Sequence, residues 1–473
     1  MTSLGMKAYY RGETEEAMRN LMEGKDPVAV LNAMRVPRQF ESEADVDYWF
    51  AHLDKAIERA ENFRMDPARF YDALWVYETF ELPYSGRNVT PYLKRIGKLV
   101  REKISKPALP HLTQPVEKRG GDKVRVAYVS RHMYAHNGAR WVEGWIDNHA
   151  DDIEVYVFNT SDRHDFVSDR IGHKVKFYQH LSGSIVQIAR YIKDFGTVGC
   201  KHYGIPEFGG FDAIIHPAIG MAGQATQLAS LNLAPVQMTA WGHPVTSGMD
   251  SVDYYLSSDL MEPENGQDHY SEELVRLPGS GLCYPRIEDG PTLGEVPLPD
   301  KYMFCAQNVM KLAPKWDFLF KECQLATGLP LVLVGGVSDA ESEKVKTRME
   351  RAGIDVVWLP QMPRPVWLEV LGKATVSLDP PAWSGGNTTV EAIHFGTPVV
   401  ALPGEFMRGR HSLCFLKQAG LERFIASNPE DYVSKVSDVV KTGERLPEGS
   451  AEPIFENKEP VRALDELLRT CAG

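Results

Sequence analysis

The stretch "SGGNTTVEAIHFGTPVVALPG", residues 384–404, combines a glycine-rich loop, a short helical pattern and an apolar β-branched run. Its apolar positions from Val390 to Phe395 have helical spacing, Gly396 ends the helix, and residues 398–402 predict a buried strand. A glycine-rich loop that leads into a helix presents unpaired backbone N–H groups and the positive end of the helix dipole. The stretch therefore predicts either an anion site suited to a phosphate or a tight structural connection.

Apolar runs typical of strands recur on both sides of this stretch and alternate with segments that can form helices. A Pro-rich, acidic segment at 285–302 divides these runs into two sets of five. The first set lies at 123–130, 153–159, 211–217, 236–242 and 252–258. The second set lies at 302–308, 329–336, 354–360, 374–380 and 397–403. Such alternation indicates parallel sheets covered by helices on both faces. We expect the α/β class, with two doubly wound, Rossmann-like domains that face a cleft beyond the carboxyl ends of their strands.

The N-terminal quarter has a different pattern. Apolar residues from Val46 to Ala60 step by three and four, which predicts an amphipathic helix, and residues 106–123 form a Pro- and Gly-rich linker. The predicted domains are an all-α N-terminal domain at 1–118, a first Rossmann-like domain at 119–290 and a second at 291–473.

The composition narrows the classes of partner. A chain of 473 residues is too long for one core, and its net charge of -12 argues against broad binding of nucleic acid or anionic membranes. The N-terminus lacks the apolar core of a signal peptide, and no apolar run approaches the length of a membrane span, so a cytoplasmic location is expected. The six cysteines are scattered without paired spacing, which favours reduced thiols. A small molecule or another protein is the expected partner.

Polar residues that directly follow predicted strands are the candidates for chemistry in this fold class. In the first domain, His136 follows the first strand and is a candidate base, and Gly242 and His243 open the turn "GHPVTSG". A surface histidine and a structural turn are the plain alternatives.

The second domain offers parts that suit a nucleoside diphosphate. Lys311, with Asn308 before it, would face the 384–389 loop and neutralise a diphosphate. Arg364 and Trp367 supply a cation and a flat ring, and Glu391 could accept hydrogen bonds from ribose hydroxyls. No Asp-x-Asp stands at a strand end and no His/Cys cluster has ligand spacing, so no metal is expected.

Two long motifs carry a family resemblance. Residues 231–259, "LNLAPVQMTAWGHPVTSGMDSVDYYLSSD", and residues 384–412, "SGGNTTVEAIHFGTPVVALPGEFMRGRHS", resemble the catalytic region of glycosyltransferase family 41. This family contains the protein O-GlcNAc transferases and bacterial cytoplasmic N-glucosyltransferases. The resemblance implies a GT-B fold, with the acceptor on the first Rossmann-like domain and a UDP-sugar on the second. It also implies an inverting mechanism without a metal or other cofactor, and a protein acceptor modified on Ser, Thr or Asn.

The resemblance also assigns roles to single residues. His136 matches a histidine near the reacting centre, Lys311 matches the lysine on the diphosphate, and Gly242 and His243 lie in the turn that approaches the donor sugar. The other positions implied to bind the donor are Asn308, Arg364, Trp367, Asn387, Thr388, Thr389 and Glu391. The chain departs from the family at Gly386, where a histidine is expected, and it lacks a long repeat array for protein acceptors.

These departures leave alternatives open. The same chemistry could act on a glycan, a lipid-linked or a small-molecule acceptor. A UDP-sugar 2-epimerase and an inactive scaffold are further alternatives, the second if the imidazole absent at Gly386 is essential. The donor sugar, a hexose or an N-acetylhexosamine, and the oligomeric state also stay open. We expect the helical domain to face the acceptor or a partner, with a purely structural role as the alternative.

Overall fold

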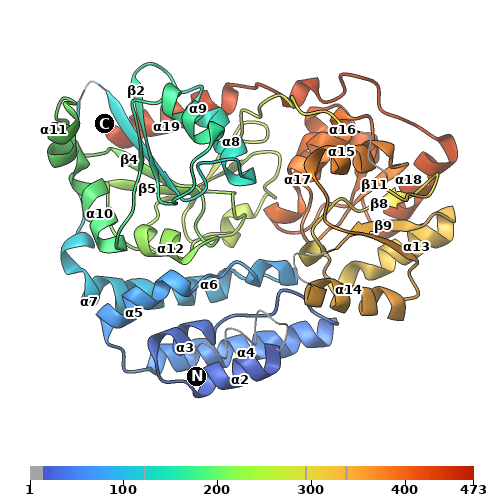
Figure 1. The fold of residues 1–473 in the computed structure, drawn as a ribbon, viewed down its shortest axis with the longest axis horizontal. Helices are drawn as coiled ribbons and strands as arrows, with labels where there is room; N and C mark the ends of the chain where they lie inside the picture. The colour runs from blue at the N-terminus through green and yellow to red at the C-terminus, as the bar shows by residue number, and fades with distance from the viewer. Residues whose placement is uncertain (1–13, 122, 293–295, 336–338) are drawn as a thin grey trace.

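The computed structural model describes residues 14–121, 123–292, 296–335 and 339–473 (Figure 1). The first thirteen residues of the predicted helical domain therefore lie outside the described residues. Two α/β units stand side by side, and the N-terminal helices run beneath both of them (Figure 1). Among the helices of the described residues there is no candidate for a membrane span.

The first unit is built on a seven-stranded parallel sheet in the order β3-β2-β1-β4-β5-β6-β7. Its strands are β1 (Val124–Ser130), β2 (Ile153–Asn159), β3 (Phe177–His180), β4 (Ala213–His216), β5 (Val236–Ala240), β6 (Tyr254–Ser258) and β7 (Glu273–Leu277). All five predicted runs are strands. The sequence did not predict β3 and β7, because both are edge strands whose residues are mostly half-buried or exposed and so lack a continuous apolar run.

The second unit contains a five-stranded parallel sheet in the order β10-β9-β8-β11-β12. Its strands are β8 (Met303–Phe304), β9 (Leu331–Val334), β10 (Val356–Leu359), β11 (Val376–Asp379) and β12 (Val399–Ala401), and each lies within a predicted run. The strand order reverses direction between β8 and β11. In doubly wound sheets, ligands bind beyond the carboxyl ends of the strands at such a switch point.

Helices flank both sheets, as expected for doubly wound units (Figure 1). The first unit contains α8 (Asn137–Ile146), α9 (Phe166–Lys174), α10 (Ile185–Asp194), α11 (Cys200–Tyr203) and α12 (Gly223–Ala229). The second contains α13 (Asp317–Thr327), α14 (Asp339–Arg351), α15 (Arg364–Lys373), α16 (Asn387–His394), α17 (His411–Gln418) and α18 (Pro429–Thr442). All six cysteines are buried free thiols.

The described part of the N-terminal region is helical, as predicted. It contains α2 (Thr14–Glu23), α3 (Pro27–Asn32), α4 (Glu43–Asn62), α5 (Pro67–Ala73), the 3-10 turn η2 (Leu82–Ser85), α6 (Thr90–Lys98), the π-helical η3 (Leu99–Ser105) and α7 (Lys106–Ala108). Ser42 caps α4 by accepting a hydrogen bond from the Asp45 N–H. The apolar face predicted between Val46 and Ala60 is buried in a core that the helices share with the first unit.

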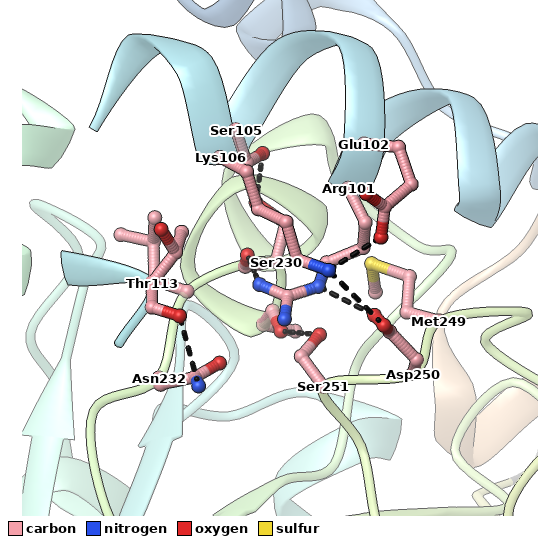
Figure 2. Close-up of polar contacts among 12 residues, drawn as sticks. Arg101, Glu102, Ser105, Lys106, Thr113, Ser230, Asn232, Met249, Asp250 and Ser251 are labelled. Atoms are coloured by element: carbon pink, nitrogen blue, oxygen red, sulfur yellow. Dashed lines mark hydrogen bonds and ion pairs between the residues drawn. The ribbon is translucent and has the colours of Figure 1, made fainter. Parts of the chain in front are cut away.

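Polar contacts fasten these helices to the first unit (Figure 2). Arg101, which is buried, donates to Asp250 Oδ1 at 2.6 Å and to the Ser230 carbonyl at 2.6 Å. The hydroxyls of Ser105 and Ser230 lie 2.8 Å apart. Because the buried guanidinium has partners on the facing unit, the two parts pack in one defined arrangement.

The last helix, α19 (Glu459–Ala472), corrects one predicted boundary. The sequence places residues 459–472 with the second sheet, but α19 lies against β1, β4 and β7 of the first (Figure 1). Buried Asp465 accepts hydrogen bonds from His149 Nδ1 and from the Ala150 N–H, and His149 Nε2 lies 2.7 Å from the Tyr128 hydroxyl. The amphipathic pattern of α19 suits either sheet, and these distant partners decide which one it covers.

Replacing His149 with alanine is expected to lower the free energy of unfolding by about 3 kcal/mol, because the buried Asp465 carboxylate loses its side-chain partner. Urea unfolding monitored by tryptophan fluorescence measures this change. Arg469→Ala is the control on the same helix, because its ion pair with Asp152 is solvent-exposed and should contribute less than about 1 kcal/mol. Equal effects of the two substitutions would contradict the role given to the buried contact.

Candidate functional site

The glycine-rich loop follows β11 and is held in place by the aspartate that ends that strand. Asp379 accepts hydrogen bonds from Ser384 Oγ at 2.6 Å and from the Gly385 N–H at 2.7 Å. Burial raises the pKa of Asp379 to about 6, and these hydrogen bonds act in the opposite direction. Asp379 therefore holds the start of the loop in place, just before the chain enters α16.

The two glycines of the loop have different surroundings. A Cβ at Gly385 would lie 2.6 Å from Gln307 Nε2 and from the Thr388 and Thr389 hydroxyls, so no larger residue fits there without a shift. A Cβ at Gly386 would meet no atom within 4 Å. Gly386 precedes α16 and has no side chain to cap it, which leaves room for an anion beside the helix N-terminus.

Lys311 lies across from this loop, as predicted. It follows β8, and its Nζ donates to Gln307 Oε1 at 2.7 Å and to the Ser384 carbonyl at 3.3 Å. Gln307 Nε2 in turn donates to the Thr388 hydroxyl at 2.6 Å. Burial lowers the pKa of Lys311 to about 8, and the nearby Asp379 carboxylate acts against that shift. A bound anion would raise this pKa again.

The two threonines of the motif differ in position. Thr389 is buried, and its hydroxyl contacts Ser412 Oγ at 2.6 Å and the Gly385 carbonyl at 3.0 Å. Thr388 is half-buried and contacts Gln307. Thr388 is therefore placed to reach a ligand, whereas Thr389 supports the loop.

Glu391 and Arg364 lie at the boundary between the two units. The Glu391 side chain is only 2% exposed, and its Oε1 lies 2.6 Å from Arg364 Nη1 and 3.3 Å from Nη1 of Arg140, which belongs to α8 of the first unit. Arg364 also pairs with Asp289 at 2.7 Å. Burial raises the pKa of Glu391, and the two guanidinium groups oppose the shift. Both arginines contact the same carboxylate oxygen, so Glu391 links the two units.

The other predicted donor-site residues of the second unit have local partners. Asn308 is exposed, and its Oδ1 caps a short turn by accepting a hydrogen bond from the Met310 N–H. Asn387 accepts a hydrogen bond from the Tyr284 hydroxyl. Trp367 is half-buried, with its ring centroid 6.3 Å from that of Phe304.

His136 lies at the start of α8, one turn before Arg140. Its Nδ1 accepts a hydrogen bond from the Gly138 N–H at 2.9 Å, and its ring stacks on His132 with centroids 4.4 Å apart. Burial lowers the pKa of His136, and nearby Arg163 adds to the shift. The ring is therefore neutral near pH 7. Because Nδ1 accepts, the proton of the neutral ring lies on Nε2.

Gly242 and His243 follow β5 on the first unit. A Cβ at Gly242 would lie 2.3 Å from the Pro217 carbonyl oxygen, so close backbone packing alone accounts for this glycine. His243 is only 2% exposed, and its ring centroid lies 5.2 Å from that of Phe80 and 5.8 Å from that of Trp383. Burial lowers the pKa of His243 to about 3.

Two residues that the sequence analysis did not single out lie between the units. The rings of Trp241 and His411 are 5.0 Å apart, and burial lowers the pKa of His411 to about 3, with Lys311 contributing. Among the described residues, the buried polar atoms without a protein partner include Trp241 Nε1, His243 Nε2, His411 Nε2 and Arg364 Nη2. Buried polar atoms usually have a partner in the functional state, so the neighbouring Trp241 and His411 favour a polar ligand between them. The sequence could have pointed to these two residues, because Trp241 directly follows a strand and His411 begins a helix.

No set of potential metal ligands accompanies these residues. Within the part of the chain that the structure describes, His, Cys, Asp and Glu side chains nowhere gather in threes as a metal ion would require.

Comparisons with known proteins find relatives of the sequence and of the fold. No family model matches the sequence. A probable UDP-N-acetylglucosamine–peptide N-acetylglucosaminyltransferase, SPINDLY, of Solanum lycopersicum is 28% identical over 210 residues, 42% of this chain and 23% of the relative. A UDP-glucose:protein N-β-glucosyltransferase of Actinobacillus pleuropneumoniae is 23% identical over 231 residues, 46% of this chain and 36% of the relative. The chain thus spans about a quarter of the length of the plant relatives it matches.

A solved structure agrees along nearly the whole chain. An O-GlcNAc transferase mutant from Thermobaculum terrenum superposes with a TM-score of 0.69 at 21% identity, covering 99% of this chain and 86% of the other. This likeness confirms the predicted fold class, two Rossmann-like units preceded by helices. The chain is therefore a GT-B protein related to the O-GlcNAc transferases and the bacterial protein N-glucosyltransferases, as its two motifs indicated.

Proposed function

We propose that this protein is an inverting, metal-independent glycosyltransferase that moves a hexose or N-acetylhexosamine from a UDP-sugar to a protein side chain. The observation that carries the proposal is the position of Lys311 and the 384–389 loop at the switch point of the second sheet. Arg140 of the first unit, one turn after His136, contacts Glu391 of the helix that follows this loop. The printed names of the relatives, which are peptide and protein glycosyltransferases, support a UDP-sugar donor and a protein acceptor.

The second unit would stabilise the leaving group. When the bond between the sugar and UDP breaks, the diphosphate gains negative charge while the sugar passes through an oxocarbenium-like state. The Lys311 ammonium and the N-terminus of α16 would neutralise that charge. The Thr388 hydroxyl now accepts from Gln307 and keeps its own proton to donate to a phosphate oxygen. These groups would supply the charge stabilisation for which other transferases use a metal.

His136 would act from the first unit. In the neutral ring the Nε2–H is free to donate to an oxygen of the bound substrates, because Nδ1 is occupied by the Gly138 N–H. Removal of a proton from an acceptor hydroxyl by Nε2 would require the other tautomer and the loss of this cap bond. The ligand-free geometry therefore favours a role for His136 in orienting substrate.

The unpartnered atoms between the units support a polar group such as a sugar. The indole N–H of Trp241 can donate a hydrogen bond, and neutral His411 can accept or donate one at Nε2. A hydroxyl both donates and accepts, so it would complement these two side chains. A sugar is rich in such groups.

The proposal is tested by incubating the protein with radiolabelled UDP-glucose or UDP-N-acetylglucosamine and a cell extract, with and without excess EDTA. We expect label in the protein fraction, at the same level in both conditions, because Lys311 and α16 carry the leaving-group charge. Label confined to lipid or small molecules would contradict the protein acceptor. Loss of transfer in EDTA that manganese or magnesium restores would contradict metal independence.

A further inference from the structure

A turn from the helical region reaches the second unit beside the glycine-rich loop. It consists of η2 (Leu82–Ser85) followed by Gly86 and Arg87. Gly86 has a positive φ of 76°, and a Cβ there would lie 3.5 Å from Ala382 Cβ and 3.6 Å from Ala313 Cβ. The turn is therefore seated between the segment that precedes the loop and the segment that follows Lys311.

An aromatic stack joins this turn to the loop. The rings of Tyr84 and Trp383 are parallel, with an interplanar angle of 4° and centroids 4.1 Å apart. Trp383 is buried and directly precedes Ser384, the first residue of the loop. Phe80 extends the cluster, since its ring lies 5.3 Å from Tyr84 and 5.2 Å from His243. Displacement of Trp383 would therefore be transmitted to Ser384 through one peptide bond.

A second connection runs through Arg408, which is buried. Its Nη2 donates to the Arg87 carbonyl at 2.6 Å, and its own carbonyl accepts from the Ser384 N–H at 2.7 Å. Ser384 is thus held on one side by Asp379, from its own sheet, and on the other by residues anchored to the helical turn. The helical region contributes to the position of the loop although none of its residues is among the predicted donor contacts.

We propose that residues 82–87 position the glycine-rich loop for its anion, with Tyr84 as the positioning residue. The inference rests on the proposed function, since the anion is taken to be the diphosphate of UDP. The helical region then has a part in donor binding besides any contact with an acceptor. Tyr84 acts through Trp383, so what matters is its ring, and the phenol hydroxyl is dispensable.

The test compares UDP binding by the full-length wild type with that of Tyr84→Ala, Tyr84→Leu and Tyr84→Phe, using calorimetry at 25 °C on proteins whose near-UV circular dichroism shows them folded. Loss of the stack is expected to weaken UDP binding about five- to tenfold in the alanine and leucine variants. Tyr84→Phe should bind as the wild type does. Tyr92→Ala is the matched control, because Tyr92 is a half-buried tyrosine of the same region that contacts Phe50, away from the loop.

Hydrogen exchange of the ligand-free proteins tests the positioning itself. Residues 383–391 should exchange faster in Tyr84→Ala and Tyr84→Leu than in the wild type, and at the wild-type rate in Tyr84→Phe and Tyr92→Ala. Unchanged exchange and unchanged UDP affinity in the alanine and leucine variants would overturn the inference. If the wild type itself fails to bind UDP, the proposed donor is wrong, and the exchange rates still decide whether Tyr84 positions the loop.

Discussion

Replacing Lys311 with alanine is expected to lower the rate of sugar transfer by about 10²- to 10³-fold, because the departing diphosphate would lose the cation proposed to neutralise it beside the 384–389 loop. UDP affinity should fall by at least about tenfold, the effect of one charge-assisted contact. Steady-state kinetics and calorimetry with UDP measure the two effects separately.

The pH dependence adds a sharper expectation for Lys311. Its pKa is lowered to about 8 in the ligand-free protein, and only the protonated amine stabilises the leaving group. The rate constant kcat/KM should therefore fall as the pH rises through this pKa, and Lys311→Ala should lack that alkaline limb. Lys315→Ala removes the same charge four residues away, at a side chain that lies over Trp316, and should leave both kinetics and affinity unchanged. Wild-type UDP affinity in Lys311→Ala would show that the donor site is wrongly placed.

Replacing His136 is expected to lower transfer by about 10- to 100-fold, because a hydrogen bond from the neutral ring to bound substrate is lost. Burial lowers the pKa of His136 below its ordinary value of about 6.5. Wild-type activity should therefore persist to pH values below 6.5 and fall only when the ring gains a proton. Protonation leaves the Nε2–H donor in place but breaks the cap bond, since Nδ1 could no longer accept from Gly138, and the ring then loses its position.

Two substitutions separate the imidazole from the helix cap. Asparagine is a good N-cap residue, so His136→Asn should retain the hydrogen bond from the Gly138 N–H, whereas His136→Ala loses it. If the imidazole acts on substrate, both variants lose transfer to a similar extent, and Tm falls only in the alanine variant. Restoration of transfer in His136→Asn would mean that His136 serves the fold of α8 and has no direct part in the reaction.

The strands of both sheets could be predicted from the sequence, because the apolar runs that mark them are local. Each of the ten predicted apolar runs contains a strand, since a strand buried in a parallel sheet needs a continuous apolar segment. The loop at 384–386 and Lys311 could likewise be placed from their positions after β11 and β8, because the carboxyl ends of neighbouring parallel strands meet at one edge. The edge strands β3 and β7 were not predicted, because their residues are mostly half-buried or exposed and do not need to be apolar.

Tertiary structure alone decided which polar side chains are available to a ligand. Thr388 and Thr389 are adjacent and chemically identical, yet only the second is buried against Ser412. Glu391 meets Arg140 from 251 residues away, and Tyr84 meets Trp383 across a similar span. Residue spacing predicts the faces of helices and the ends of strands, because both depend on neighbours along the chain. Partners that join separate units depend on how those units pack, and no local pattern records them.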